Sequence, residues 1–209
     1  EEAEARAIYD AAAERLSKVR REAAARFAKA VTNEMQTLSM KGGRFEVKLV
    51  PIPRSEVGVE KSEFLMAGHP GVDVSPSAKV ASGGELSRIG LAIFTLTSRN
   101  TSVPTLIFDE VDSGVGGATG EVVGRMMKQL GQTRQVLCVT HLPQVAACGD
   151  HHLKVEKVSD GIETVSYLRE LNPTQRVEEI ARMLGGLLIT QKTKVLAEEM
   201  VKANLSQEE

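Results

Sequence analysis

Two adjacent carboxylates follow a short apolar run in the middle of the chain. The run Thr105–Phe108 has the character of a buried strand, and Asp109 and Glu110 come directly after it. In open α/β sheets, ligands bind at the carboxyl ends of the strands, so both acids would lie where a ligand can reach them. Asp109 could hold a magnesium ion, and Glu110 could polarise a water molecule that attacks a phosphate. For this pattern alone, the alternative is an acidic strand end or helix cap without a chemical role.

A Ser-Gly-Gly turn lies upstream of the acids and opens directly into a helix-period segment. It comprises Ser82, Gly83 and Gly84 and is followed by Glu85. The first turn of a helix carries unpaired N–H groups and the positive end of the helix dipole, which suits an anion. Two glycines would let a phosphate approach the backbone closely. The alternative is an ordinary serine N-cap with a glycine-rich turn.

Two further polar segments follow the acids along the chain. A glycine-rich turn carries Asp112 and Ser113, and the apolar run Val136–Val139 ends on Thr140 and His141. A single histidine at a strand end is usually structural. As the third member of an ordered series of polar strand and helix ends, His141 instead indicates a functional residue.

Together these segments resemble the ABC ATPase superfamily. The Ser-Gly-Gly-Glu run resembles its signature motif in the SMC-like form, the acids resemble Walker B, the following turn resembles the D-loop, and His141 resembles the switch histidine. The flanks at 79–88, 109–112 and 140–146 are similar to the RecN family of SMC-like bacterial DNA-repair ATPases, with coverage from about residue 44 to 186. One departure is His69, which stands where the family pattern has asparagine.

The resemblance implies ATP and Mg²⁺ as ligands, bound at composite sites between two heads. It implies catalytic roles for Glu110 and His141 and a metal-binding role for Asp109. It also implies nucleotide-binding roles for Ser82, Gly83, Gly84, Glu85, Asp112 and Ser113, the first four of which would cap the γ-phosphate of a nucleotide held by the opposite head. The implied process is DNA double-strand break repair and recombination on the nucleoid, in the cytoplasm.

The sequence contains no Gly-x-x-x-x-Gly-Lys-[Ser/Thr] loop, which holds the β- and γ-phosphates in such ATPases. We therefore expect this chain to be inactive alone. The expected partners are the N-terminal half of the same protein, with the Walker A lobe and the other coiled-coil strand, a second head in a homodimer, and DNA. The alternative function is a nucleotide-switched head-dimerisation module of another SMC-like protein, without turnover of its own.

The elements that must position these residues begin with a long helix. From about residue 3 to residue 40 the chain has no Gly or Pro, and its larger apolar residues recur at helical spacing from Ile8 to Leu38. Gly42 and Gly43 are expected to end the helix. The stripe predicts one strand of a coiled-coil arm over 1–41, followed by an ATPase lobe over 42–209. The alternative is an amphipathic helix that packs on its own domain.

The rest of the chain alternates between strand and helix patterns. Pro51 and Pro53 are expected to close a first strand that pairs with a second, short one. The expected strands are 45–50, 64–66, 105–108, 136–139, 153–158 and 164–168; the expected helices are 85–99, 118–130, 174–184 and 190–205; and 68–78 is expected to be a loop. The fold class is α/β, the C-terminal lobe of an ABC/SMC-type head with a sheet flanked by helices, preceded by the arm helix.

Bulk composition sets the remaining limits. The formal net charge of -2 in 209 residues gives no overall attraction to nucleic acid or an anionic membrane. Two cysteines do not make a disulfide framework, and no apolar run reaches the ~18 residues of a membrane helix. Because the chain starts with Glu-Glu and not with Met, we expect it to be a piece of a longer protein.

Overall fold

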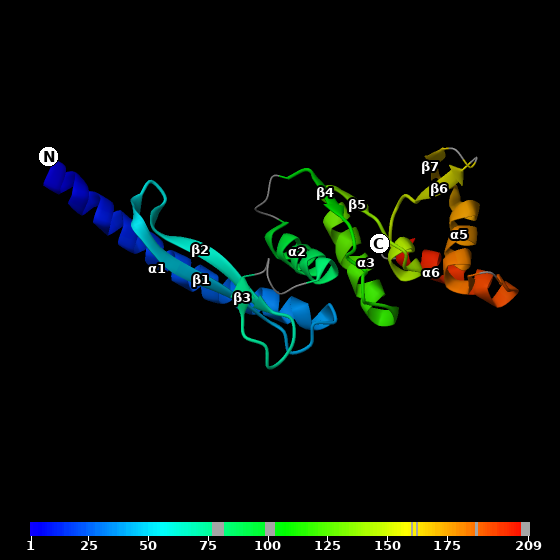
Figure 1. Ribbon diagram of the computed structural model, residues 1–209, viewed down its shortest axis with the longest axis horizontal. Coiled ribbons are helices and arrows are strands. Elements are labelled where there is room, and N and C mark those ends of the chain that lie inside the picture. Colours follow the sequence, from blue (N-terminus) through cyan, green and yellow to red (C-terminus); the bar gives the residue numbers. More distant parts are fainter. Residues whose placement is uncertain (77–81, 99–102, 160, 162, 187, 206–209) are drawn as a thin grey trace. The chain divides into compact units, whose positions relative to one another are not determined.

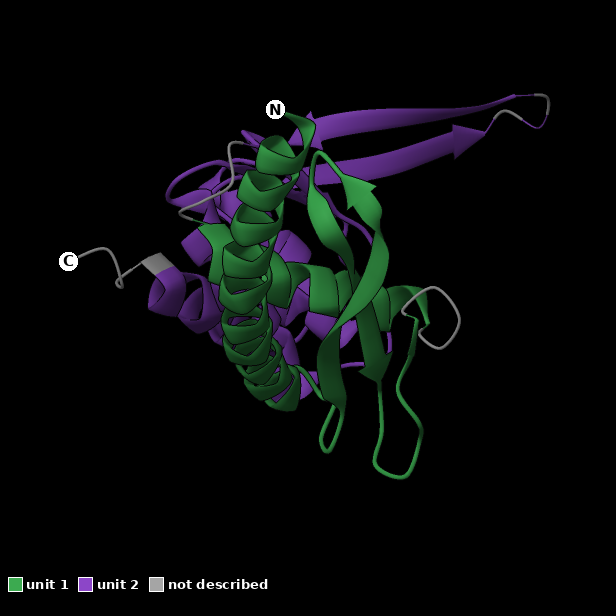
Figure 2. Cartoon of the chain, turned by 90° about the vertical axis from the view of Figure 1, so that its left-hand side faces the viewer, with its two compact units in different colours: residues 1–99 green, residues 100–209 purple. Residues whose placement is uncertain are grey.

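The chain forms two compact units, Glu1–Arg99 and Asn100–Glu209 (Figure 2). A computed structural model describes residues 1–76, 82–98, 103–159, 161, 163–186 and 188–205. Within these ranges, no helix is both long and apolar enough to cross a membrane.

Unit 1 begins with the long helix that the sequence predicts. Helix α1 spans Glu2–Thr37, so it ends three residues before the expected position. The reason is a compact turn around its last residues, in which Gln36 accepts from the backbone N–H of Gly42 at 2.8 Å and donates to the carbonyl oxygen of Gly43 at 3.1 Å. Gly42 has a φ of +75°, the left-handed conformation that glycine adopts at low cost.

A β-hairpin packs along α1 (Figure 1). Strand β1, Arg44–Ser55, pairs antiparallel with β2, Gly58–Ala67. Phe27 of α1 meets Phe45 and Phe64 of the hairpin, with ring centroids 5.4–6.2 Å apart across the three pairs. Such aromatic pairs stabilise a core by about 0.5–1.5 kcal/mol beyond their buried area.

The hairpin is longer than predicted. We expected Pro51 and Pro53 to end β1, but the strand continues to Ser55 through a shift in register after Pro51. The sheet order β1-β2-β3 makes β1 an edge strand, where a missing N–H can face away from the ladder. The expected loop over 68–78 contains a short third strand, β3, at Ser75–Pro76, paired with β2.

The apolar stripe of α1 has two environments. Near the C-terminal end of the helix, Val31 and Met35 are fully buried against unit 1. Nearer the N-terminus, Ile8 and Val19 are 68% and 60% exposed. The N-terminal half of the helix also packs on the hairpin, because Tyr9 hydrogen-bonds to Ser55 and Ala13 and Ser17 are buried, so Ile8 and Val19 form an exposed apolar seam on another side of the helix.

Helix α2 spans Gly83–Thr97 and completes unit 1. It contacts α1 and buries Ile89, Leu91 and Ala92. This packing fixes the first turn of α2, where the Ser-Gly-Gly segment lies.

Unit 2 begins with two parallel strands joined through a helix. Strand β4, Thr105–Phe108, pairs with β5, Gln135–Cys138, so that Phe108 lies opposite Cys138. Helix α3, Gly117–Gly131, connects them and buries its apolar face. The two strands thus end side by side, as the sequence predicts for an α/β sheet.

A four-residue helix, α4 at Pro143–Ala146, follows β5 and was not expected from the sequence. It packs closely on α3 because Gly124 has no side chain. A Cβ at this position would lie 2.7 Å from Sγ of Cys148. This approach sets the path of the chain directly after His141.

The rest of unit 2 is a second hairpin and two helices. Strands β6, Leu153–Ser159, and β7, Thr164–Glu170, pair antiparallel. Helices α5, Pro173–Gly185, and α6, Gln191–Leu205, pack on each other. Their shared core contains Ala147, Ile180, Ala181, Ala197 and Val201.

Candidate functional site

The two acids lie where β4 leaves its sheet. Phe108, the last residue of the strand, is buried, whereas Asp109 and Glu110 are exposed. The backbone N–H of Glu110 donates to Oδ1 of Asp109 at 2.9 Å. Glu110 has a φ of +55°, a left-handed conformation that costs a non-glycine residue roughly 1–3 kcal/mol. Backbone strain of this kind is concentrated at functional sites.

The structure brings Asp112 and His141 together at the ends of the paired strands. Oδ2 of Asp112 lies 3.2 Å from Nδ1 of His141 and accepts from the backbone N–H of His141 at 2.9 Å. The same oxygen accepts from the hydroxyl of Thr140 at 2.5 Å. Asp112 is only 2% exposed, whereas the side chain of His141 is 72% exposed. One buried carboxylate therefore holds the turn that carries an exposed imidazole.

The turn between the acids and α3 is compact. The backbone N–H of Ser113 donates to the carbonyl of Glu110 at 3.0 Å, and that of Val115 donates to the carbonyl of Asp112 at 3.3 Å. Gly114 and Gly117 have φ values of +71° and +52°. The turn exposes Ser113 to solvent, while Asp112 points inward.

In unit 1, the Ser-Gly-Gly segment forms the start of α2, as predicted. Ser82 is the N-cap and makes a reciprocal capping box with Glu85. The backbone N–H of Ser82 donates to Oε2 of Glu85 at 3.0 Å, and the backbone N–H of Glu85 donates to Oγ of Ser82 at 3.3 Å. Gly83 and Gly84 occupy the first helical turn. The flanking residues 79–81 lie outside the described residues.

His69 lies against this helix start. Its Nε2 is 3.6 Å from Oε1 of Glu85, and a Cβ at the adjacent Gly68 would come within 3.2 Å of the same oxygen. The residue that departs from the family pattern therefore contacts the capping carboxylate of the predicted signature motif.

The predicted site residues thus form two groups. Asp109, Glu110, Asp112 and His141 lie at the ends of β4 and β5 in unit 2, and Ser82–Glu85 lie at the start of α2 in unit 1. Sequence reasoning gave no role to Thr140, although it adjoins His141. Thr140 links the two turns, because its hydroxyl donates to Asp112 of the first turn while its oxygen accepts from the backbone N–H of Leu142 in the second at 3.0 Å. The sequence signal that could have identified Thr140 is a hydroxyl residue between a buried strand and a histidine.

The thiol of Cys138 lies at the end of β5. Burial raises its pKa to about 12, and the carboxylates of Asp112 and Asp109 add to the shift. Because the thiolate is the reactive form of cysteine, this side chain is a poor nucleophile. Cys138 and Cys148 are both free.

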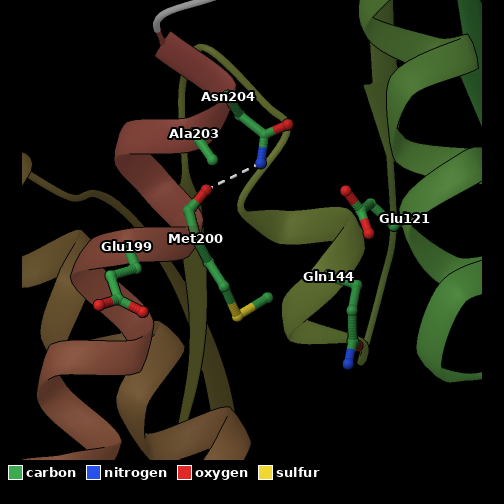
Figure 3. Close-up of a pocket in the computed structure, with 6 residues that line it drawn as sticks. All are labelled: Glu121, Gln144, Glu199, Met200, Ala203 and Asn204. Carbon is green, nitrogen blue, oxygen red and sulfur yellow. Dashed lines mark hydrogen bonds between the residues drawn. The ribbon is translucent and has the colours of Figure 1, made fainter.

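Unit 2 also contains a cavity of about 250 Å³ between α3, α4 and α6 (Figure 3). Its lining includes Glu121, Gln144, Glu199, Met200 and Asn204, and Asn204 donates to the carbonyl of Met200 at 2.8 Å. It includes neither the acids after β4 nor His141, so the predicted chemistry does not use it.

Comparison with curated proteins identifies relatives named DNA repair protein RecN. The chain is 45% identical over 197 residues to the DNA repair protein RecN of Vibrio cholerae, covering 93% of this chain and 36% of that protein. It is 46% identical over 195 residues to RecN of Xylella fastidiosa, covering 91% and 35%. RecN of Streptomyces coelicolor is 41% identical over 210 residues, covering 94% and 37%. The chain therefore spans about a third of the length of these relatives. No family model matches it.

Solved structures support the fold. The Smc head domain of Pyrococcus yayanosii, with a coiled coil and joint, matches 74% of this chain and 28% of its own, at a TM-score of 0.54 and 23% identity. A structure described by ATP-driven dimerisation and DNA-stimulated activation of SMC ATPases matches 83% of this chain and 99% of its own, at a TM-score of 0.51 and 20% identity. The fold is that of an SMC-type ATPase head with a long N-terminal helix, as predicted from the sequence.

Proposed function

Because the chain belongs to the RecN family, we propose that it supplies the C-terminal half of an ATP-hydrolysing head that acts in DNA double-strand break repair and recombination. The chain spans about a third of its relatives, so the activity belongs to the longer protein. We place that protein on the nucleoid, in the cytoplasm.

One observation carries the proposal. The turn after β4 and the turn after β5 are joined by Asp112, which accepts from the backbone N–H of His141 at 2.9 Å. This contact brings the carboxylates of Asp109 and Glu110 and the imidazole of His141 to the same end of a parallel strand pair. Ligands of α/β sheets bind at this end, and an ATPase needs its metal-binding acid, water-orienting acid and phosphate contact together.

The residues at this end fit a Mg²⁺–nucleotide site. Asp109 is an exposed carboxylate at a strand end, and magnesium takes one or two carboxylates together with phosphate oxygens and waters. When bound, Mg²⁺ neutralises charge on the β- and γ-phosphates. Glu110 accepts a hydrogen bond from the attacking water and orients it toward the γ-phosphate. His141 contacts the γ-phosphate and the attacking water, and the reaction depends mainly on positioning and electrostatics.

A second head supplies the other side of the site. Ser82 already accepts from the backbone of Glu85, so its hydroxyl hydrogen can donate to a phosphate oxygen. The start of α2 then caps the γ-phosphate of a nucleotide bound to the opposite head, with Gly83 and Gly84 allowing close approach and Ser113 contacting the nucleotide across the interface. A solved SMC ATPase with the same fold is described by ATP-driven dimerisation, which fits a site shared between two heads.

The N-terminal half of the same protein covers an apolar face of β4 and β5. Leu106 and Phe108 are buried on one face of this strand pair, but Ile107 is 71% exposed and Val139, just beyond β5, is 63% exposed. Parallel strands are normally covered on both faces. A lobe with the Walker A loop would cover this face and complete the nucleotide site.

The exposed seam of α1 fits the other strand of a coiled-coil arm. Ile8 and Val19 lie about three helical turns apart and are 68% and 60% exposed. We retain the arm assignment for residues 1–41 and the lobe assignment for 42–209. DNA is a partner of the complete protein.

The test is Mg-ATP turnover of the full-length protein with and without Glu110→Gln. Turnover should fall by on the order of 100-fold in the variant, as expected when a water-positioning group is lost. The control is Glu178→Gln, an equal charge change at an exposed residue of α5. Unchanged turnover in Glu110→Gln would favour the alternative, a nucleotide-switched dimerisation module. Residues 1–209 alone should be silent and gain activity on mixing with the upstream half.

A further inference from the structure

Asp112 differs from the other acids of the site in its environment. Asp109 and Glu110 are exposed, whereas Asp112 is 2% exposed. A buried carboxylate is costly unless hydrogen bonds compensate for its lost hydration. Its Oδ2 meets the hydroxyl of Thr140 and both the backbone and the ring of His141.

The direction of these hydrogen bonds follows from the groups involved. The backbone N–H of His141 can only donate, so Oδ2 of Asp112 is an acceptor. The oxygen of Thr140 accepts from Leu142, so its hydroxyl hydrogen is directed to Asp112. The third neighbour of Oδ2 is Nδ1 of His141 at 3.2 Å, where the carboxylate attracts a protonated Nδ1 and repels the lone pair of an unprotonated one. The carboxylate therefore favours the imidazole form with its hydrogen on Nδ1.

We propose that Asp112 is a positioning residue that fixes the ring orientation and tautomer of His141 and does not itself contact nucleotide. This inference rests on the proposed ATPase function and revises the nucleotide-binding role that the family resemblance implies for Asp112. The carboxylate joins the turn after the acids to the turn after β5, so movement of either turn changes the position of the imidazole. Partners that orient metal-binding histidines are worth roughly 10- to 100-fold in activity, and we expect an effect of similar size for Asp112.

The kinetic test is a double-mutant cycle in the full-length protein. Asp112→Asn and His141→Gln should each lower kcat by roughly 10- to 100-fold, with KM for ATP within about twofold of wild type. The double variant should be no slower than the slower single variant, because both changes remove the same contribution. A raised KM for Asp112→Asn, or multiplied losses in the double variant, would show that Asp112 acts on nucleotide directly and would overturn the proposal.

A spectroscopic measurement remains decisive if Asp112→Asn fails to fold. Wild-type protein with ¹⁵N-labelled histidine, recorded at pH 8.5 where an ordinary imidazole is neutral, should show His141 with its proton on Nδ1. His141→Gln identifies the signal. Free neutral histidine favours the Nε2–H form, so that form at His141 would also overturn the proposal. If Glu110→Gln loses turnover but folded Asp112→Asn keeps full turnover, the positioning role of Asp112 is rejected and the ATPase function stands. If Glu110→Gln keeps its turnover, the ATPase function itself is rejected.

Discussion

Ser82 and Glu85 cap each other's backbone at the first turn of α2, through hydrogen bonds of 3.0 and 3.3 Å. The hydroxyl oxygen of Ser82 is thereby used as an acceptor within the chain, and its hydrogen can donate outward. The same residue can therefore stabilise the helix and contact a phosphate, and the two contributions can be separated by substitution.

Ser82→Ala and Ser82→Asp should separate the contribution of Ser82 to stability from its contribution to head association. Alanine removes the cap and should cost about 1 kcal/mol of stability, whereas aspartate is as good an N-cap as serine and should leave stability within about 0.5 kcal/mol. Aspartate places a negative charge against the phosphate, so Ser82→Asp should abolish ATP-driven association of heads in the full-length protein. Thermal unfolding and light scattering with ATP measure the two effects. ATP-dependent dimers of Ser82→Asp would remove Ser82 from the proposed interface.

The left-handed backbone at Glu110 predicts an inverted order of stability for two substitutions. At an ordinary helix position alanine is more stabilising than glycine by about 1 kcal/mol. At Glu110, with a φ of +55°, Glu110→Gly should be more stable than Glu110→Ala by about 1 kcal/mol, although both remove the carboxylate and should be inactive. The same pair at exposed Glu198 of α6 is the control and should show the usual order. The usual order at both positions would mean that the strain is relieved in solution.

Much of the site could be predicted because its residues are set by local sequence. An apolar run followed by Asp109 and Glu110, and another followed by His141, places all three at strand ends once the strands are parallel neighbours. The Ser82–Glu85 spacing similarly specifies a capping box without any tertiary information. These are patterns of a few residues, and the fold need only bring their elements together.

The parts that were missed depend on tertiary contacts. Pro51 reads as a strand terminator, but β1 lies at a sheet edge and tolerates it. The contact between Asp112 and His141 spans 29 positions, and nothing in either segment alone indicates which acid of the Asp-Glu-Val-Asp run points inward. The exposure of Ile8 and Val19 likewise depends on where the hairpin lies along α1.

The ion pairs around Glu179 predict a dependence of stability on pH. This buried carboxylate accepts from Arg182 at 2.6 Å and lies 3.1 Å from Nζ of Lys154, which links α5 to β6. Burial alone raises the pKa of Glu179, but the hydrogen bonds from Arg182 and Lys154 outweigh burial and lower it below the ordinary glutamate value. A lowered carboxylate pKa stabilises the fold above the unfolded-state value, and this contribution is lost as the pH falls through the folded-state value.

Glu179→Gln should therefore lower the midpoint of thermal unfolding of unit 2 by a few degrees at pH 7, corresponding to about 1–2 kcal/mol. The gap from wild type should close as the pH falls through the lowered pKa of Glu179. Glu198→Gln, at a more exposed ion pair of 3.8 Å with Lys202, is the control and should shift the midpoint by less than a degree or so. A gap that is the same at pH 7 and pH 3.5 would show that packing and not charge accounts for the effect.

The bare face of β4 and β5 predicts where the N-terminal half binds. Ile107 is 71% exposed in this chain, and complete burial of such a side chain contributes about 1.5–3 kcal/mol. Ile107→Glu should weaken capture of the separately produced upstream half by at least about 10-fold, since each 1.4 kcal/mol is a factor of ten. Leu188→Glu is the matched control, because Leu188 is 80% exposed and lies outside the strand pair. Equal capture by Ile107→Glu and wild type would place the upstream half on another surface. The nucleotide site at the ends of β4 and β5 would then not be completed by a lobe that covers Ile107.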